Sequence, residues 1–299
     1  MTAAKPTLKT LLGNYPISRP LREGTLVPET FAFEFADVKV PNRAFKRAVR
    51  DLEFDIAELA LVTFFQAKAY GKPLSLVPAV VGAGRFQHHC LVYNAERPRV
   101  TVAQLAGKRI GIRALAQTTV TWVRGVLAED YGVPLDRIQW VTLEDGHLAE
   151  FPDPPGVERA RPGATMPEML FSGELDAAII GTDLPDDPRL QPVLPDPHAA
   201  ARAWAERHRM LPINHMVAVK TELLRERPDV VRELFSLLQH SKQLGAPAQP
   251  GAPDLTPFGI EPNRRSLELL LRYSYAQGLI PRLYGVDELF DDFIQATQP

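Results

Sequence analysis

Two segments far apart in the chain follow the same order of helix, turn, aspartate and short apolar strand. They read AFKRAVRDLEFDIAELAL and MPEMLFSGELDAAIIGTDLP, and in each an aspartate, Asp55 or Asp176, stands directly before the strand. A helix followed by a short buried strand is typical of α/β units. We predict that each aspartate organises its helix-to-strand turn by accepting backbone N–H bonds and takes no part in catalysis.

Apolar runs of strand length alternate with helical patterns along the rest of the chain. FAFEFADV alternates apolar and polar residues as a half-buried strand does, and LSLVPAVV, RIGI and INHMVAV have strand length. The helical segment TELLRERPDVVRELFSLLQHSKQL is interrupted at Pro228. This alternation predicts an α/β fold and excludes all-β and all-helical folds.

The two repeats indicate two lobes joined by a hinge, with a ligand cleft between them. We expect residues 1–95 and 216–299 to form the first lobe and residues 96–215 to form the second. The chain would cross between the lobes at HHCLVYN and INHMVAV. On this hypothesis the histidines of both runs converge on one cleft.

The composition excludes several classes of protein. Of 299 residues 45% are hydrophobic and the formal net charge is -2, which suits a globular core and offers no basic track for nucleic acid. No stretch reaches the roughly 20 apolar residues of a membrane helix. The first residues lack an apolar run of signal-peptide length, so we expect a cytoplasmic protein. The single cysteine, Cys90, excludes an internal disulfide and a cysteine-rich zinc site, and its apolar neighbours are typical of a core position.

Three histidines stand at the starts of apolar runs: His88 and His89 before LVYN, and His215 before MVAV. Each could pack in a core, bind a metal or transfer a proton. Successive side chains of a strand point to opposite faces, so we expect one of His88 and His89 to be structural. The three histidines with Glu58 or Asp55 could hold zinc, but the chain lacks the close His and Glu spacing of typical zinc sites. We therefore predict neither a metal nor a cofactor.

The turn ALAQTTVT leads into the helical pattern TWVRGVL. Its backbone N–H groups, the helix dipole and the hydroxyls of Thr118, Thr119 and Thr121 could hold a carboxylate, with Arg124 nearby. The alternative is that Thr118 or Thr119 only caps the helix and that Arg124 is solvated. Trp122 is more often a core residue, although an indole facing the ligand would suit an aromatic ring.

The order of segments resembles the type II periplasmic-binding-protein fold, with VYNAERPRVTVAQLAGKRIGIR similar to the entry into its second lobe. Four stretches carry a closer resemblance: FDIAELAL, TWVRGVLAEDYGV, LPINHMVAV and FGIEPNRRSLELLLRYSYAQGL. Together they resemble 4,5-dihydroxyphthalate decarboxylase and its relatives, which use this fold in the cytoplasm. The resemblance implies a small aromatic carboxylate as ligand and allows for a homo-oligomer.

The resemblance also implies cofactor-independent decarboxylation of a hydroxylated aromatic acid such as 4,5-dihydroxyphthalate. This reaction needs an acid at the ring carbon, an acceptor at the phenol and a cation for any retained carboxylate. We expect His88 to donate the proton, with His215 as the second candidate. Glu58 could accept the phenolic proton, and Arg19 and Arg124 could bind a carboxylate.

Two other functions stay open. A solute-binding protein for a small organic anion would share the fold, and the missing signal sequence argues against it. Another ring-processing lyase on the same fold, such as an intramolecular lyase of a menaquinone-type pathway, would be favoured by a larger and more apolar cleft.

Overall fold

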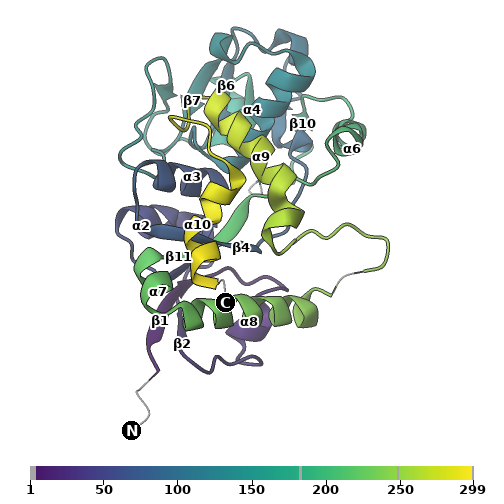
Figure 1. The fold of residues 1–299 in the computed structure, drawn as a ribbon. Helices are drawn as coiled ribbons and strands as arrows, with labels where there is room; N and C mark the ends of the chain where they lie inside the picture. Colours follow the sequence, from purple (N-terminus) through teal and green to yellow (C-terminus); the bar gives the residue numbers. More distant parts are fainter. Residues whose placement is uncertain (1–4, 182–183, 248, 298–299) are drawn as a thin grey trace. The chain divides into compact units, whose positions relative to one another are not determined.

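The chain folds into two compact units. The computed structural model describes residues 5–181, 184–247 and 249–297. Unit 1 comprises Met1–Gly84, Ile213–Leu271 and Ile280–Pro299, and unit 2 comprises Arg85–Pro212 and Arg272–Leu279. Unit 2 is thus built largely from the teal middle of the chain, whereas unit 1 takes both its purple start and its yellow end (Figure 1).

Unit 1 contains a five-stranded sheet that is parallel except for one strand. Its strands in spatial order are β2 (Ala32–Phe35), β1 (Thr7–Leu11), β3 (Ile56–Ala60), β11 (His215–Lys220) and β4 (Leu74–Val80). β1 pairs in parallel with β2 and β3, whereas β11 is antiparallel to both β3 and β4. A late segment of the chain is therefore inserted between two early strands.

The helices of unit 1 are short before β4 and long near the C-terminus. Their bounds are α1 (Arg19–Arg22), α2 (Phe45–Arg50), α3 (Leu61–Ala69), α7 (Thr221–Glu226), α8 (Pro228–Gly245), α9 (Ile260–Ala276) and α10 (Val286–Thr297), with a 3₁₀ turn at Pro41–Ala44. The boundary between the units falls within α9, after Leu271. The predicted interruption at Pro228 is confirmed, because α7 ends at Glu226 and α8 begins at the proline.

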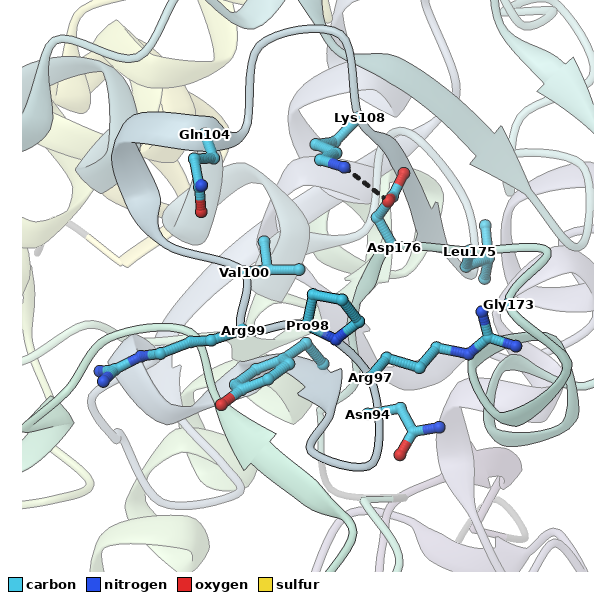
Figure 2. A pocket seen from close by; sticks show the side chains of 11 residues that line it. Asn94, Arg97, Pro98, Arg99, Val100, Gln104, Lys108, Gly173, Leu175 and Asp176 are labelled. Carbon is cyan, nitrogen blue, oxygen red and sulfur yellow. Dashed lines mark hydrogen bonds and ion pairs between the residues drawn. The ribbon is translucent and has the colours of Figure 1, made fainter.

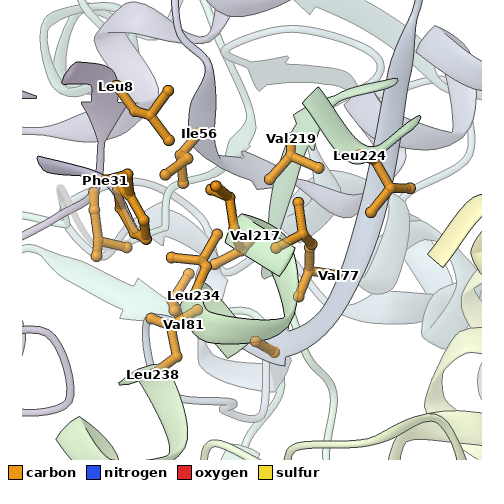
Figure 3. Packing of buried hydrophobic residues seen from close by; sticks show 14 of the residues in the cluster. Leu8, Phe31, Ile56, Val77, Val81, Val217, Val219, Leu224, Leu234 and Leu238 are labelled. Atoms are coloured by element: carbon orange, nitrogen blue, oxygen red, sulfur yellow. The ribbon is translucent and has the colours of Figure 1, made fainter. Parts of the chain in front are cut away.

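The main core of unit 1 lies between the sheet and the helices that follow β11. Leucine, valine, isoleucine and phenylalanine side chains of the strands meet Leu224 of α7 and Leu234 and Leu238 of α8 (Figure 3). α8 presents these apolar residues on one face, as an amphipathic helix does. This core fixes the position of β11, and hence of His215 at its start.

Unit 2 contains a six-stranded mixed sheet. Its spatial order is β10 (Leu190–Pro192), β5 (Leu91–Asn94), β9 (Ala177–Ile179), β6 (Arg109–Ile112), β7 (Gln139–Thr142) and β8 (Glu158–Arg159). Its helices are α4 (Thr118–Tyr131), α5 (Met166–Ser172) and α6 (Pro197–His208), with 3₁₀ turns at His88–Cys90, Val102–Gln104 and Leu135–Arg137. β6 is parallel to β7 and β9, an arrangement that is common in α/β units.

The two aspartates of the repeat have equivalent structural roles. The carboxylate of Asp55 accepts the backbone N–H of Lys9, and that of Asp176 accepts the backbone N–H of Arg109, at 2.8 and 2.9 Å. Each also binds a lysine ammonium, at 2.8 and 2.9 Å respectively. Each aspartate therefore accepts a backbone N–H as predicted, but the donor belongs to the neighbouring parallel strand and not to the aspartate's own turn.

Two details differ from the expectations. His88 and His89 lie in a 3₁₀ turn and not in the strand, which begins at Leu91, so the alternation rule for strands does not apply to them. The structure also divides the chain after Gly84 and after Pro212, because β5 pairs with β9 and β10 in the sheet of unit 2. Within the described ranges, no helix combines the length and the apolar character needed to cross a membrane.

Candidate functional site

A buried carboxylate organises the edge of the unit 1 sheet where its parallel strands end. Glu58 of β3 is fully buried and its two oxygens accept hydrogen bonds from three donors. Oε2 accepts the backbone N–H of Gly13 at 2.9 Å, and Oε1 accepts the hydroxyl of Tyr15 and Nδ1 of His215, each at 2.7 Å. A carboxylate needs this many partners when it is removed from water.

The pairing of β11 with β3 brings His215 to Glu58. In this antiparallel ladder His215 lies opposite Ala60, and Glu58 lies opposite Val217. The histidine and the glutamate are thus diagonal neighbours on one face, a separation that long side chains can bridge. The imidazole also packs edge-on against Phe45, with ring centroids 5.2 Å apart. About a quarter of the His215 side chain stays exposed.

Tyr15 is held by the loop that follows β1. Its backbone N–H donates to the Ser18 hydroxyl at 2.9 Å, and that hydroxyl donates to the Gly13 carbonyl at 2.5 Å. A Cβ atom at Gly13 would come within 2.4 Å of the Tyr15 ring, so only glycine fits there. Burial, followed by the charge and the hydrogen bond of Glu58, raises the pKa of Tyr15 above its usual value. The phenol therefore stays protonated and acts as a hydrogen-bond donor.

This arrangement suits His215 for acid–base chemistry. Because a carboxylate only accepts, the hydrogen between His215 and Glu58 belongs to Nδ1 of the imidazole. A carboxylate in this position orients the ring and fixes its tautomer, which leaves Nε2 to exchange a proton with a ligand. The unit formed by Tyr15, Glu58 and His215 is called the carboxylate–histidine site below.

A hollow of about 610 Å³ lies beside the carboxylate–histidine site, within unit 1. Tyr15 forms part of its wall, together with Ile17 of the same loop and Ala83, which follows β4. The remaining wall comes from residues 245–247, 249 and 252–256, at and after the end of α8, in a stretch rich in proline, alanine and glycine. This volume lies in the range of about 300–1,000 Å³ that is typical of small-molecule sites.

His88 has very different surroundings in unit 2. It is buried beside Leu91, Val126, Leu127 and Leu194, and neither ring nitrogen has a hydrogen-bond partner. Burial is the main cause that lowers the pKa of His88 to about 4. The ring is therefore neutral at pH 7 and lies in an apolar environment.

The threonines predicted to bind a carboxylate lie in the first turn of α4. All three are buried, and the N-cap is Gln117, so neither Thr118 nor Thr119 caps the helix. A Cβ atom at Gly181 would lie 3.7 Å from the Thr119 hydroxyl and 3.3 Å from Nη2 of Arg85. These side chains meet where β6 and β9 end, and open α/β sheets bind their ligands at this edge. Trp122 and Thr121 have structural contacts instead. The Trp122 indole is a core residue packed against two other aromatic rings, and the Thr121 hydroxyl donates to the backbone carbonyl of Gln117.

Arg124 is a buried cation without a hydrogen-bonding partner for Nε or Nη1. Its guanidinium stacks over the ring of Trp140, 4.9 Å from the centroid. Burial lowers the pKa of Arg124 to about 10, so it remains charged at neutral pH. The sequence allowed Arg124 to be either a carboxylate ligand or a solvated helix residue, and its burial excludes the second alternative. Arg19, at the start of α1, is exposed.

A smaller hollow of about 210 Å³ lies at the opposite edge of the unit 2 sheet (Figure 2). Three cationic side chains line it, but two are engaged: Arg97 donates to the Ser172 carbonyl at 2.7 Å, and Lys108 binds Asp176 at 2.9 Å. Arg99 extends away from this ion pair in Figure 2. We assign no ligand to this hollow.

No three histidine, cysteine, aspartate or glutamate side chains are grouped as a metal site in the described ranges. Sequence reasoning included Glu58 and His215 but missed Gly13, Tyr15 and Arg85. The signal for the first two was available, since the polar sequence GNYPIS directly follows the first strand. Parallel strands place such segments at the ligand-binding edge.

Known proteins support both the fold and the family. The chain is 29% identical to 4,5-dihydroxyphthalate decarboxylase of Comamonas testosteroni, over 96% of its own length and 97% of the relative. It is 32% identical to the protein of the same name from Pseudomonas putida, over 67% of its own length and 81% of the relative. No protein-family model matches the chain.

Among solved structures, the periplasmic aliphatic sulphonate-binding protein SsuA of Escherichia coli matches with a TM-score of 0.60 at 12% identity, over 99% of this chain and 100% of that one. The alkanesulfonate-binding protein SsuA of Xanthomonas axonopodis pv. citri matches with a TM-score of 0.57 at 15% identity, over 96% and 99% of the two chains. These structures confirm the predicted periplasmic-binding-protein fold. The two curated relatives show that the chain belongs to the 4,5-dihydroxyphthalate decarboxylase family.

Proposed function

We propose that this protein decarboxylates 4,5-dihydroxyphthalate or a closely related hydroxylated aromatic acid, without a cofactor, and that His215 supplies the proton. Membership in the family supports the reaction class. The observation that carries the mechanism is the 2.7 Å hydrogen bond between His215 Nδ1 and the buried Glu58 carboxylate. It gives unit 1 a partly exposed imidazole that is oriented for proton transfer.

The reaction requires one proton and no change of oxidation state. In 4,5-dihydroxyphthalate each carboxylate is para to one hydroxyl group. Protonation of the ring carbon that bears the carboxylate places positive charge on the ring, which the para oxygen shares. The bond from this carbon to the carboxylate then breaks, its electron pair restores the aromatic ring, and carbon dioxide leaves. Because electrons and atoms balance with a single proton donor, acid catalysis by a side chain is sufficient.

The carboxylate–histidine site can provide this proton. In the proton-donating form of His215, Nδ1–H donates to Glu58 and Nε2–H is the proton that the ring carbon receives. The neutral imidazole left behind keeps its hydrogen bond to Glu58. Tyr15 donates to the same Glu58 oxygen and so holds the carboxylate in place. In this proposal Glu58 positions the acid, in place of the earlier expectation that it accepts the phenolic proton.

His88 is the weaker candidate for the same role. With a pKa of about 4, it carries a proton in only about one molecule in a thousand at pH 7. Its apolar neighbours also offer nothing that would stabilise the charged ring. Arg19, Thr118, Thr119 and Arg124 stay predictions as ligands of a substrate carboxylate.

The test is carbon dioxide release from EDTA-treated protein supplied with 4,5-dihydroxyphthalate and a panel of hydroxybenzoates. We expect turnover in the wild type, a loss of about 10²–10⁴-fold in kcat in His215→Gln, and turnover close to wild type in His88→Leu. In D₂O the product should carry deuterium at the carbon that lost its carboxylate. Loss of turnover in a folded His88→Leu, with His215→Gln active, would reverse the assignment.

One observation favours a second candidate, another ring-processing lyase on this fold. The hollow beside Tyr15 is large, and most of its wall is apolar. Product analysis by mass spectrometry separates the two functions, because a ring-forming or ring-opening lyase changes the substrate without releasing carbon dioxide. Tight binding without any product would instead indicate a solute-binding protein.

A further inference from the structure

The hollow beside the carboxylate–histidine site has walls that are fixed by the fold of unit 1. The backbone N–H of Gly84 donates to the Leu255 carbonyl at 2.7 Å, and Lys242 Nζ donates to the Thr256 carbonyl at 2.6 Å. At the other end of the wall, Gly245 touches the backbone of Pro16 so closely that no side chain fits there. Both ends of this wall, at Gly245 and at Leu255 and Thr256, are therefore attached to other parts of unit 1, including the loop that carries Tyr15.

The lining of this hollow lacks a positive charge. Among the lining residues that the structure describes, Asp254 alone carries a formal charge. Its carboxylate is occupied by Lys242 Nζ at 2.6 Å and by the backbone N–H of Thr256 at 3.0 Å. Lys242 is itself not part of the wall. A carboxylate of a ligand placed here would lose water without gaining a cation, which is unfavourable.

Most of the remaining lining is apolar, with Gln249 and Thr256 as polar members, and it is partly open to solvent. It includes Ile17, Ala83, Pro247, Ala252 and Leu255, and the Leu255 side chain is 43% exposed although it is large and hydrophobic. Contact with an apolar ligand group would cover this surface, and the gain grows with the area removed from water.

The volume of the hollow is larger than the volume that a single aromatic ring occupies. A cavity of about 150 Å³ is enough to hold benzene in another protein. The hollow measures about 610 Å³, roughly four times as much. A one-ring diacid would leave most of it to water.

We infer that the hollow binds an uncharged, apolar extension of the substrate, so that the preferred substrate is a hydroxylated aromatic acid with a bulky alkyl or aryl substituent. This inference rests on the proposed function for the position of the reacting ring, which lies at Tyr15 and His215. It assigns the role of a specificity-determining wall to residues 245–247, 249 and 252–256.

The test compares 4-hydroxybenzoates that bear hydrogen, ethyl, butyl or phenyl at carbon 3 with 4,5-dihydroxyphthalate. The readouts are kcat/KM for carbon dioxide release and, independently, Kd from calorimetry. Each buried methylene is expected to improve either quantity about four-fold, so that butyl, with two more methylenes, exceeds ethyl by about 15-fold. Ala252→Phe narrows the hollow and should reduce the ratio of butyl to hydrogen at least five-fold, roughly the contribution of one to two methylenes. Ala203→Phe, on an exposed position of α6 in unit 2, should keep the wild-type ratio.

The results separate the inference from the proposed function. Binding that improves with substituent size and responds to Ala252→Phe supports the extension pocket even if no acid is decarboxylated, and that outcome would reject only the proposed function. Substituents that weaken both binding and turnover would overturn the inference, as would a ratio that Ala252→Phe leaves unchanged.

Discussion

The charge state of His88 predicts how the stability of the protein depends on pH. Burial in unit 2 lowers the pKa of this histidine from 6.5 to about 4 in the folded protein, whereas the unfolded chain titrates near 6.5. Between these two values the unfolded state binds the proton and the folded state does not. The contribution of His88 to stability is thus fully present above about pH 6.5 and is lost as the pH falls toward 4.

The two pKa values set the magnitude of this effect. Linkage between protonation and folding gives a loss of about 2 kcal/mol in the free energy of unfolding from pH 7 to pH 5 for His88 alone. His88→Leu places an apolar side chain among Leu91, Val126 and Leu127 and removes the titrating group. The decrease in stability between pH 7 and pH 5 should therefore be about 2 kcal/mol smaller in the variant than in the wild type.

Urea unfolding monitored by tryptophan fluorescence at pH 5, 6 and 7 measures this difference. The matched control is His240→Gln, because His240 is exposed on α8 and its replacement should leave the pH dependence unchanged. If His88→Leu and the wild type lose the same stability, His88 is not a neutral buried residue in solution. The argument that His215, and not His88, donates the proton would then be refuted.

Three further substitutions test the site. Glu58→Gln should lower kcat for carbon dioxide release by about 10³–10⁴-fold, because an amide does not stabilise an imidazolium, and a value within threefold of wild type in steady-state kinetics would contradict the mechanism. Gly13→Ala should reduce the free energy of unfolding by about 1–3 kcal/mol in chemical denaturation, since its Cβ would meet the Tyr15 ring at 2.4 Å, whereas Gly146→Ala, with 3.6 Å to its nearest neighbour, should change it little. Arg124→Met should raise the melting temperature of the ligand-free protein, because it removes a buried cation with two unpartnered nitrogens; a decrease would show that the cation is paired in solution.

Local sequence patterns determined much of the fold. Period-two alternation in FAFEFADV and the proline that separates α7 from α8 each act within a few residues, and the structure has these features at the predicted positions. The aspartates stand directly before β3 and β9, but the N–H donors that they bind lie on another strand, 46 and 67 residues away. Helix α10 was missed although its signal is local: Val286, Leu289, Phe290 and Phe293 follow helical spacing and are buried. The turn at His88–Cys90 was taken for a strand, because a short apolar run does not by itself distinguish the two.

The candidate site depended on contacts that no local pattern contains. His215 and Glu58 are separated by 157 residues, and Tyr15 and Glu58 by 43. His215 meets Glu58 because β11 inserts between β3 and β4 in a defined register, which is set by the packing of its valines against α7 and α8. Tyr15 reaches Glu58 from the loop after β1, which pairs with β3. The sequence by itself could name Glu58 and His215 as candidates, since their residue types suit acid–base chemistry. Only the tertiary structure could pair them and give His88 an apolar environment, because burial and partners, which decide whether a histidine carries a proton, are properties of the assembled core.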